Sequence, residues 1–253
     1  SGRTSVTEPA PTRDHTERML TGFGYPVSRE EGVISVAGGG VLRGTEIDIP
    51  ADISSAAFFM VGASIAPGSD LLLEHVGLNP TRDGVLTILR AMGANIEVRH
   101  ERTVGGEPVA DLRIRYAPLR GIEIPVEEVP LAIDELPAIL VAAACAEGVT
   151  VLRGAEELRV KESDRIASMA EGLTHLGIHN TVAPDGITVF GGTPSGGVIA
   201  THHDHRIAMS FAMAALRASD PIIVRDCAHV ATSFPGFAEL AAKTGLRLTV
   251  TAL

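Results

Sequence analysis

Three stretches of the chain are apolar on every side of a helical projection, and each begins at an aspartate. A helix without a polar face must be surrounded by protein. Asp and Asn are favoured as N-caps, so each aspartate is expected to begin a buried helix. The stretches are DISSAAFFMVGASIA from Asp52, DELPAILVAAACA from Asp134 and DHRIAMSFAMAAL from Asp204.

The segments that follow these helices repeat in the same order. A short β-rich segment comes first (LLLEHV, VTVLRG, PIIVRD), then an amphipathic helix that ends at a glycine, and then further expected strands (ANIEVRHE, IHNTVAP, LRLTVTA). The closing glycines lie 41, 43 and 41 residues after the three aspartates, at Gly93, Gly177 and Gly245. Matched intervals of this length indicate an internal repeat. In the expected strands apolar and polar residues alternate, which predicts sheets with one packed and one solvated face. We therefore expect an α/β fold in which three units place their helices inside and their sheets outside.

The first 49 residues show only part of such a unit. The motif PTRD occurs at 11–14 and again at 80–83, and in both copies a helical pattern follows and a glycine lies ten residues after the Asp. The first copy predicts a helix over Thr12–Phe23, then Gly24 and a strand pair around VISVAG. Forty-nine residues cannot bury a core of their own. We therefore expect residues 1–49 to be a partial unit of a second, truncated domain, residues 50–253 to be a three-unit domain, and 44–52 to be the crossover between them.

Composition excludes several classes of protein. The 253 residues carry a net charge of −10, which argues against a nucleic-acid binder. Two cysteines give no disulfide framework and favour the cytoplasm, and the first residues lack the layout of a signal peptide. The most apolar stretch, Leu136–Cys145, is about half of a membrane span.

The polar residues that carry chemistry cluster near the expected helix starts. Helix N-termini favour anions, and repeated copies of one helix should point to the same side of the domain. Lys161 and Arg165, four residues apart in RVKESDR, are expected on one helix face, with Arg206 from DHR nearby. This arrangement suits phosphate or carboxylate, and Asp134 and Glu162 are candidates for proton transfer.

Simpler interpretations compete with these. Lys161 and Arg165 could be solvated surface charges, and Asp134 and Asp204 could be caps only; Asp52 has no basic neighbour and is interpreted as structural. HHDH (202–205) could suggest a metal, but a helix N-terminus repels cations and no zinc-type spacing accompanies it, so we expect no metal and no cofactor. Cys145 is expected in the core.

The motifs RVKESDR, DHRIAM, TSFPGF (232–237) and TRDHTERML (12–20), in this order, resemble the 5-enolpyruvylshikimate-3-phosphate (EPSP) synthase family. The resemblance runs over essentially the whole chain and corresponds to the C-terminal part of such an enzyme. It implies two domains, each of three βαβαββ units with internal helices. The implied reaction transfers the enolpyruvyl group of phosphoenolpyruvate to the 5-hydroxyl of shikimate 3-phosphate, in the route to chorismate and aromatic amino acids.

The resemblance also implies roles for individual residues. Asp134 corresponds to the proton acceptor that holds the shikimate ring hydroxyls. Glu162 corresponds to the proton donor to the methylene carbon, and Lys161 to a lysine beside the reacting hydroxyl. Arg165 and Arg206 match the pair that binds phosphoenolpyruvate, and His205 assists them. Arg13 matches a position facing the phosphate of shikimate 3-phosphate, whereas Arg82, from the second PTRD, is interpreted as structural.

Some features depart from the family pattern. A lysine that many members place before the S/T-F-P motif is Thr232 here, and the basic groups of the opposite wall are expected upstream of Ser1. We therefore expect a chain that is inactive alone and a monomeric full-length enzyme. Two alternatives stay open, a UDP-N-acetylglucosamine enolpyruvyl transferase, which relies on a loop cysteine, and a non-catalytic half-enzyme that packs against a partner.

Overall fold

The computed structural model describes residues 1–8 and 12–251 and has an α/β fold. Pro11, the first residue of the first PTRD, lies outside the described residues. Within these ranges the strands form four sheets. Three of them have the same order, in which the strand before a helix pairs with the second of the two strands after it: β1-β3-β2, β4-β6-β5 and β7-β9-β8.

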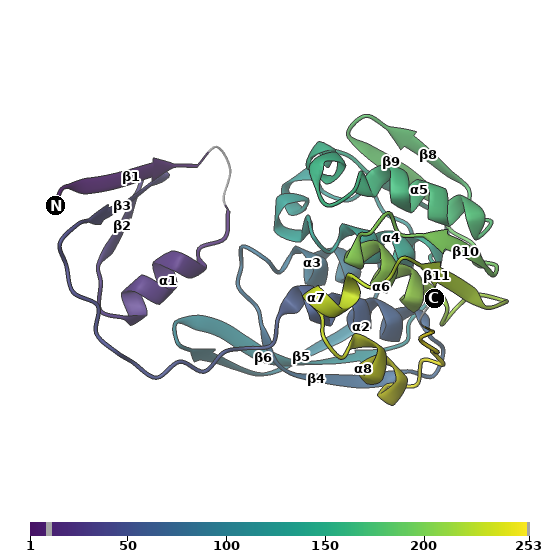
Figure 1. Ribbon diagram of the computed structural model, residues 1–253, viewed down its shortest axis with the longest axis horizontal. Coiled ribbons are helices and arrows are strands. Elements are labelled where there is room, and N and C mark those ends of the chain that lie inside the picture. Colours follow the sequence, from purple (N-terminus) through teal and green to yellow (C-terminus); the bar gives the residue numbers. More distant parts are fainter. Residues whose placement is uncertain (9–11, 252–253) are drawn as a thin grey trace.

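The first 49 residues form one of these three-stranded sheets and one helix. Figure 1 shows this part at the left, joined to the rest by an extended segment. Of its described residues only Ser35 is buried, as expected for a piece too short to hold a core. Its elements are β1 (Arg3–Thr7), α1 (His15–Gly22), β2 (Val27–Glu30) and β3 (Val33–Ala37).

The remaining elements form three units in sequence. The first unit contains α2 (Ile53–Ile65), β4 (Asp70–Gly77), α3 (Gly84–Ala91), β5 (Asn95–Val104) and β6 (Glu107–Arg115). The second contains η1 (Val126–Glu128), η2 (Pro130–Ala132), α4 (Leu136–Ala144), β7 (Val149–Leu152), η3 (Glu156–Val160), α5 (Arg165–His175), β8 (Asn180–Ala183) and β9 (Gly186–Phe190). The third contains β10 (Gly197–Ala200), α6 (His205–Ala214), β11 (Ile222–Arg225), α7 (Val230–Ser233) and α8 (Phe237–Lys243).

The apolar helices lie at the centre, as their sequences predict. Every residue of α4 is buried, and α2, α4 and α6 pack against one another. In Figure 1 the sheets surround these helices. On β6 the apolar Leu112 and Ile114 face the core, while Arg113 and Arg115, which alternate with them, keep contact with solvent. The inside-out arrangement of the units is therefore confirmed.

A parallel pairing begins each unit. Ala51 pairs with Val76, Glu123 pairs with Val151, and β10 pairs along its length with β11. The segment before each central helix therefore lies beside the strand after it. In the third unit this pairing forms the first strand of a βαβαββ unit, and in the first two units an isolated bridge stands in its place.

The four glycines that close the amphipathic helices share one conformation. Gly24, Gly93, Gly177 and Gly245 have φ of 75°, 93°, 75° and 105°, a region that side chains with a Cβ avoid. Each follows the C-cap residue of its helix, at the position where glycine ends helices. The periodic glycines in the sequence therefore mark true helix ends.

Three local predictions are wrong. Asp134 does not cap α4, which begins after Glu135; its carboxylate is engaged by arginines instead. Lys161 and Glu162 do not share a helix with Arg165, because Asp164 caps α5 and the helix begins at Arg165. Residues 246–251 of the expected strand LRLTVTA are not a strand, since they pair with none of the described strands.

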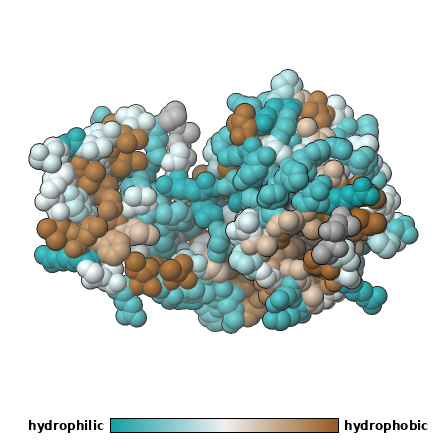
Figure 2. Space-filling view, viewed as in Figure 1, coloured by the Kyte–Doolittle hydropathy of each residue, from teal (hydrophilic) through white to brown (hydrophobic). Residues whose placement is uncertain are grey.

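Residues 1–49 carry much exposed apolar surface. Figure 2 shows hydrophobic residues grouped over this region. The described large apolar side chains exposed there are Val6, Met19, Val41, Leu42, Ile47 and Ile49. The division of the chain at residue 50 remains a prediction.

Candidate active site

The starts of the three central helices meet at one end of residues 50–253. The Ser54 hydroxyl, in the first turn of α2, donates a hydrogen bond to the Glu135 carboxyl, just before α4. Arg206, in the first turn of α6, donates from Nη1 to the carbonyl oxygen of Asp134 at 3.0 Å. The free N–H groups of three helix N-termini therefore lie close together, and they favour negative charge.

Asp134 is the meeting point of three arginines from distant parts of the chain. Its carboxylate lies 2.7 Å from Arg13 Nη2, 3.4 Å from Arg165 Nη1 and 3.8 Å from Arg206 Nη2. Burial alone would raise the pKa of Asp134, but Arg206, Arg13, Lys161 and Arg165 outweigh burial and hold it below its usual value. Asp134 is therefore an ionised acceptor in this structure.

Arg165 is the largest charged side chain that the fold buries. Only 1% of the side chain is exposed, and its guanidinium contacts three carboxylates: Asp204 at 2.8 Å, Glu162 and Asp134. Asp204 also caps α6 by accepting from the Arg206 N–H at 2.9 Å. Burial would raise the pKa of Asp204, but the hydrogen bond and charge of Arg165 lower it. Arg165 therefore ties α5 to the starts of α4 and α6.

The loop between η3 and α5 brings two further predicted residues to the rim. Glu162 is half-exposed and pairs with Arg165. Lys161 pairs with Glu157, and it lies close enough to Asp134 for its charge to lower the pKa of that carboxyl. Their placement comes from a loop rather than from the helix face that the sequence suggested.

His205 is the first residue of α6, between Asp204 and Arg206. Partial burial and the adjacent Arg206 charge lower the pKa of its imidazole. The side chain is therefore neutral near pH 7 and able to donate or accept a proton. The structure thus brings Asp134, Arg13, Arg165, Arg206 and Glu162 into one connected cluster, with Lys161 and His205 beside it.

This cluster has the chemistry of an anion site with internal counter-ions. Each arginine faces a carboxylate of the protein. An anionic ligand can bind to N–H groups of Arg206 and Arg13 that have no partner, or it can displace one of these carboxylates from its arginine. Among residues 1–8 and 12–251 no group of three His, Cys, Asp or Glu side chains is arranged to hold a metal ion.

The family model for EPSP synthase (3-phosphoshikimate 1-carboxyvinyltransferase) matches residues 1–240. The chain belongs to the EPSP synthase family. Two curated relatives named 3-phosphoshikimate 1-carboxyvinyltransferase, from Alkalilimnicola ehrlichii and Methylococcus capsulatus, are 68% and 66% identical to it, each over 98% of this chain. The chain spans 56% and 57% of the length of these relatives.

A solved structure agrees with this membership. EPSP synthase from Acinetobacter baumannii is 58% identical, with a TM-score of 0.96, over 100% of this chain and 59% of that one. The enolpyruvyl transferase NikO from Streptomyces tendae is 21% identical with a TM-score of 0.76, over 100% of this chain and 58% of its own, which shows a shared fold.

The departures from the EPSP synthase pattern have structural counterparts. Thr232 lies in α7, where its hydroxyl donates to the His229 carbonyl at 2.7 Å and supplies no cation. Burial raises the pKa of Cys145 to about 12 and the residue packs against the core, as predicted. An un-ionised thiol of this kind does not act as a nucleophile near pH 7.

Sequence reasoning missed a layer of residues beneath the cluster. Glu135 is buried behind Asp134, and burial raises the pKa of its carboxyl. Ser54 donates to Glu135 and accepts from Arg82, which also pairs with Asp52 at 2.9 Å. Asp52 therefore has a basic neighbour, Arg82, that its own segment did not indicate, and the interpretation of both residues as structural stays a prediction. The one available signal for Glu135 was an acidic residue at the start of an otherwise apolar run.

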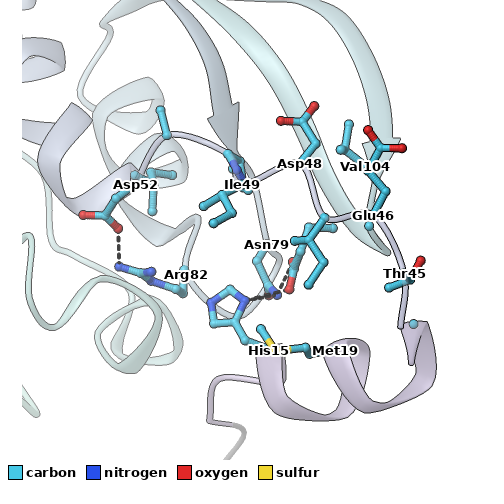
Figure 3. Close-up of a pocket in the computed structure, with 18 of the residues that line it drawn as sticks. His15, Met19, Thr45, Glu46, Asp48, Ile49, Asp52, Asn79, Arg82 and Val104 are labelled. Carbon is cyan, nitrogen blue, oxygen red and sulfur yellow. Dashed lines mark hydrogen bonds and ion pairs between the residues drawn. The ribbon is translucent and has the colours of Figure 1, made fainter. Parts of the chain in front are cut away.

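A separate cavity of about 280 Å³ lies between α1, residues 45–53 and the β5–β6 turn. Figure 3 shows His15, Met19 and Asn79 on its wall, together with the Arg82–Asp52 pair. It contains none of the seven predicted site residues. The candidate active site is therefore the cluster around Asp134, and the cavity is a gap in the packing beside it.

Proposed function

We propose that this chain supplies one wall of an active site that transfers the enolpyruvyl group of phosphoenolpyruvate to the 5-hydroxyl of shikimate 3-phosphate. The observation that carries the proposal is the convergence of Arg13, Arg165 and Arg206 on an ionised Asp134 at three helix N-termini. Both substrates are anions, and such a site attracts anions. Family membership and the names of the two relatives support the same reaction.

In this proposal Asp134 accepts the proton of the 5-hydroxyl as its oxygen bonds to C2 of phosphoenolpyruvate. Glu162 delivers a proton to the methylene carbon, which gives a tetrahedral adduct. Loss of a proton from the resulting methyl group and cleavage of the bond between C2 and the phosphate oxygen then release phosphate and restore the double bond. Lys161 stabilises the oxygen that reacts, and His205 assists beside Arg206.

The ion pair between Glu162 and Arg165 links substrate binding to proton transfer. In this structure the Glu162 carboxylate occupies a donor of Arg165. A carboxylate of phosphoenolpyruvate that takes this donor would free Glu162, which must take up a proton from solvent before it can protonate the methylene carbon. Arg206 has more exposed donors, so we expect it to contact phosphoenolpyruvate first and Arg165 to follow when Glu162 moves.

Arg13 is proposed to bind the phosphate of shikimate 3-phosphate. Its side chain is 43% exposed, and Nη2 donates to the Asp134 carboxylate, which leaves its other N–H groups open. It comes from residues 1–49, whereas the other cations come from residues 50–253. The proposed site therefore needs both parts of the chain, which we take as partial and complete domains divided near residue 50.

The test compares three samples by phosphate release from the two substrates together. They are the chain alone, a hybrid that joins it to the region of the Alkalilimnicola ehrlichii relative that it does not cover, and the hybrid with Asp134→Asn. We expect turnover by the hybrid only, because the remaining groups are needed to hold the substrates in attack geometry. Asp70→Asn, in an exposed sheet pair with Arg113, is the matched control.

Two results would contradict the proposal. A folded hybrid that binds neither phosphoenolpyruvate nor shikimate 3-phosphate would show that the proposed reaction is wrong. Turnover by the chain alone at the rate of the hybrid would mean that this wall is not half of a divided site.

No helix among the described residues has both the length and the apolar character to cross a bilayer. The finer expectations are part of the proposal: a monomeric complete enzyme that works in the cytoplasm, without a cofactor, on two small anions. Cys145 and Cys227 are both free thiols, which is compatible with a reducing compartment.

A further inference from the structure

A second polar cluster, which we call the α1 latch, joins the start of α1 to the first unit. It consists of Asp14, His15, Arg18, Asn79 and Glu107. Asn79 Nδ2 donates to Asp14 at 2.7 Å and to Glu107 at 2.8 Å. His15 Nδ1 lies 2.7 Å from Glu107 Oε1, and Arg18 Nε donates to Asp14 at 2.8 Å. The two PTRD regions thus face each other, since Asn79 directly precedes the second copy.

Asn79 is the fixed member of the latch. It is 3% exposed, and its Oδ1 accepts from the Thr81 N–H at 2.8 Å and the Thr81 hydroxyl at 2.7 Å. Both ends of the amide therefore have partners, and a flipped amide would place its oxygen against two carboxylates. The orientation that presents two N–H donors to α1 is set by the turn in which Asn79 lies.

Asp14 gives its carboxylate to the latch instead of to its own helix. It occupies the N-cap position of α1, but its side chain makes no capping hydrogen bond. Burial would raise the pKa of Asp14, whereas hydrogen bonds from Arg18 and Asn79 and the charge of Arg18 lower it. An N-cap aspartate normally stabilises its helix, so the diverted carboxylate indicates that docking is the function of this side chain.

Apolar packing does not hold α1 in position against the first unit. The helix has no buried residue, and Met19 is 52% exposed. Figure 3 shows the cavity that separates part of α1 from residues 45–53, with His15 and Asn79 at its edge. Directional hydrogen bonds therefore fix the position of α1 against the first unit.

Arg13 directly precedes Asp14, so the latch also sets where Arg13 reaches. The geometry points to Asn79 as a positioning residue that holds Arg13 beside Asp134, and so tunes the affinity for the phosphate-bearing acceptor. This inference rests on the proposed function, in which Arg13 binds that phosphate. The Asn79 amide donates to Asp14 and Glu107 rather than to Asp134, so it acts on Arg13 through Asp14.

The inference is tested in the hybrid enzyme by comparing the effects of two single variants with the effect of the double variant. We expect Arg13→Ala to raise KM for shikimate 3-phosphate by roughly 10- to 100-fold, the range of a charge-assisted hydrogen bond. Asn79→Ala should raise the same KM by about tenfold and leave kcat and KM for phosphoenolpyruvate nearly unchanged. The double variant should be no worse than Arg13→Ala, because Asn79 acts through Arg13. Effects that multiply would overturn the inference.

Two further variants separate positioning from general stability. Asn79→Asp keeps the acceptor for Thr81 and replaces the two N–H donors by an oxygen, so it should raise KM more than Asn79→Ala while preserving the turn. Asn180→Ala is the matched control, because Asn180 ties β8 to α5 inside the second unit, by donating to the Ala170 carbonyl at 3.1 Å. It should leave KM unchanged.

A measurement without turnover keeps this test distinct from the test of the proposed function. Hydrogen exchange of the 253-residue chain, without substrate, should be about tenfold faster at the amides of α1 in Asn79→Asp than in the parent chain. Exchange in α5 and α6 should not change. Faster exchange with an inactive hybrid would refute the proposed function but keep the latch, whereas unchanged exchange in α1 would overturn the latch itself.

Discussion

Asp204 Oδ2 lies 2.8 Å from Arg165 Nε, and the two side chains are only 0% and 1% exposed. Removing one member of a buried ion pair leaves the other charge without compensation, at a cost of about 3–5 kcal/mol. Asp204→Asn should therefore lower the free energy of unfolding by about this amount, measured by urea denaturation. Asp70→Asn, which breaks an exposed pair with Arg113, should change it little; equal losses would show that burial of the pair does not matter.

Arg206 tests the anion site directly. Its Nη groups lie at the Asp134 carbonyl and carboxylate, next to three helix N-termini. In the hybrid enzyme Arg206→Ala should weaken phosphoenolpyruvate by about 1.5–3 kcal/mol and shikimate 3-phosphate much less. Steady-state kinetics with each substrate varied in turn measures both effects. Arg99→Ala, on an outer sheet face, is the control, and equal losses for both substrates would contradict the assignment.

Glu135 should make stability depend on pH in one direction. Burial raises the pKa of its carboxyl in the folded chain, so the folded state keeps a proton that the unfolded state loses above pH of about 4.3. Stability therefore falls as pH rises from that value towards the raised folded pKa. Glu135→Gln cannot ionise, and its advantage in unfolding free energy should grow over the same interval and then level off. Urea denaturation at a series of pH values measures this advantage, with Glu239→Gln on α8 as the exposed control. An advantage independent of pH would contradict the explanation.

A substitution at Gly245 measures how much unfolding free energy is lost when a residue with a Cβ takes the left-handed conformation at a helix end. Its φ is 105°, and an added Cβ would meet nothing within 4 Å, so Gly245→Ala introduces strain without a clash. We expect a loss of about 1–2 kcal/mol in unfolding free energy. Gly44→Ala is the control, because that position also has open space but no positive φ. A loss no greater than that of the control would show that the helix end relaxes.

The central helices could be predicted from sequence because a helix that is buried on all sides has apolar residues on every face. The closing glycines could be predicted because glycine adopts their positive φ far more readily than other residue types. Which aspartate caps a helix could not, since Asp52, Asp134 and Asp204 look alike and differ only in the arginines that reach them. LRLTVTA alternates like a strand, but a strand also needs a neighbouring edge, which local sequence does not describe.

The candidate site could be predicted only in part for a similar reason. Motifs gave the arginines and Asp134, because charged residues stand out near helix starts. The latch gave no such signal: Asn79 bonds to Asp14, 65 positions away, and His15 to Glu107, 92 positions away. Ordinary polar residues acquire a role of this kind only when the fold brings them together.

The repeated architecture also gives the molecule one end at which substitutions affect the candidate site and an opposite end at which they should be tolerated. Since the central helices all begin at the site, their C-terminal ends lie at the far side; α2, with 13 residues, extends about 20 Å. The turns there, at 66–69, 145–148 and 216–221, contain exposed residues and none of the chemistry. A fluorophore or an inserted peptide at Gly68, Glu147 or Ser219 should therefore leave the candidate active site undisturbed. Amino-acid substitutions among related sequences should also be most frequent at these turns.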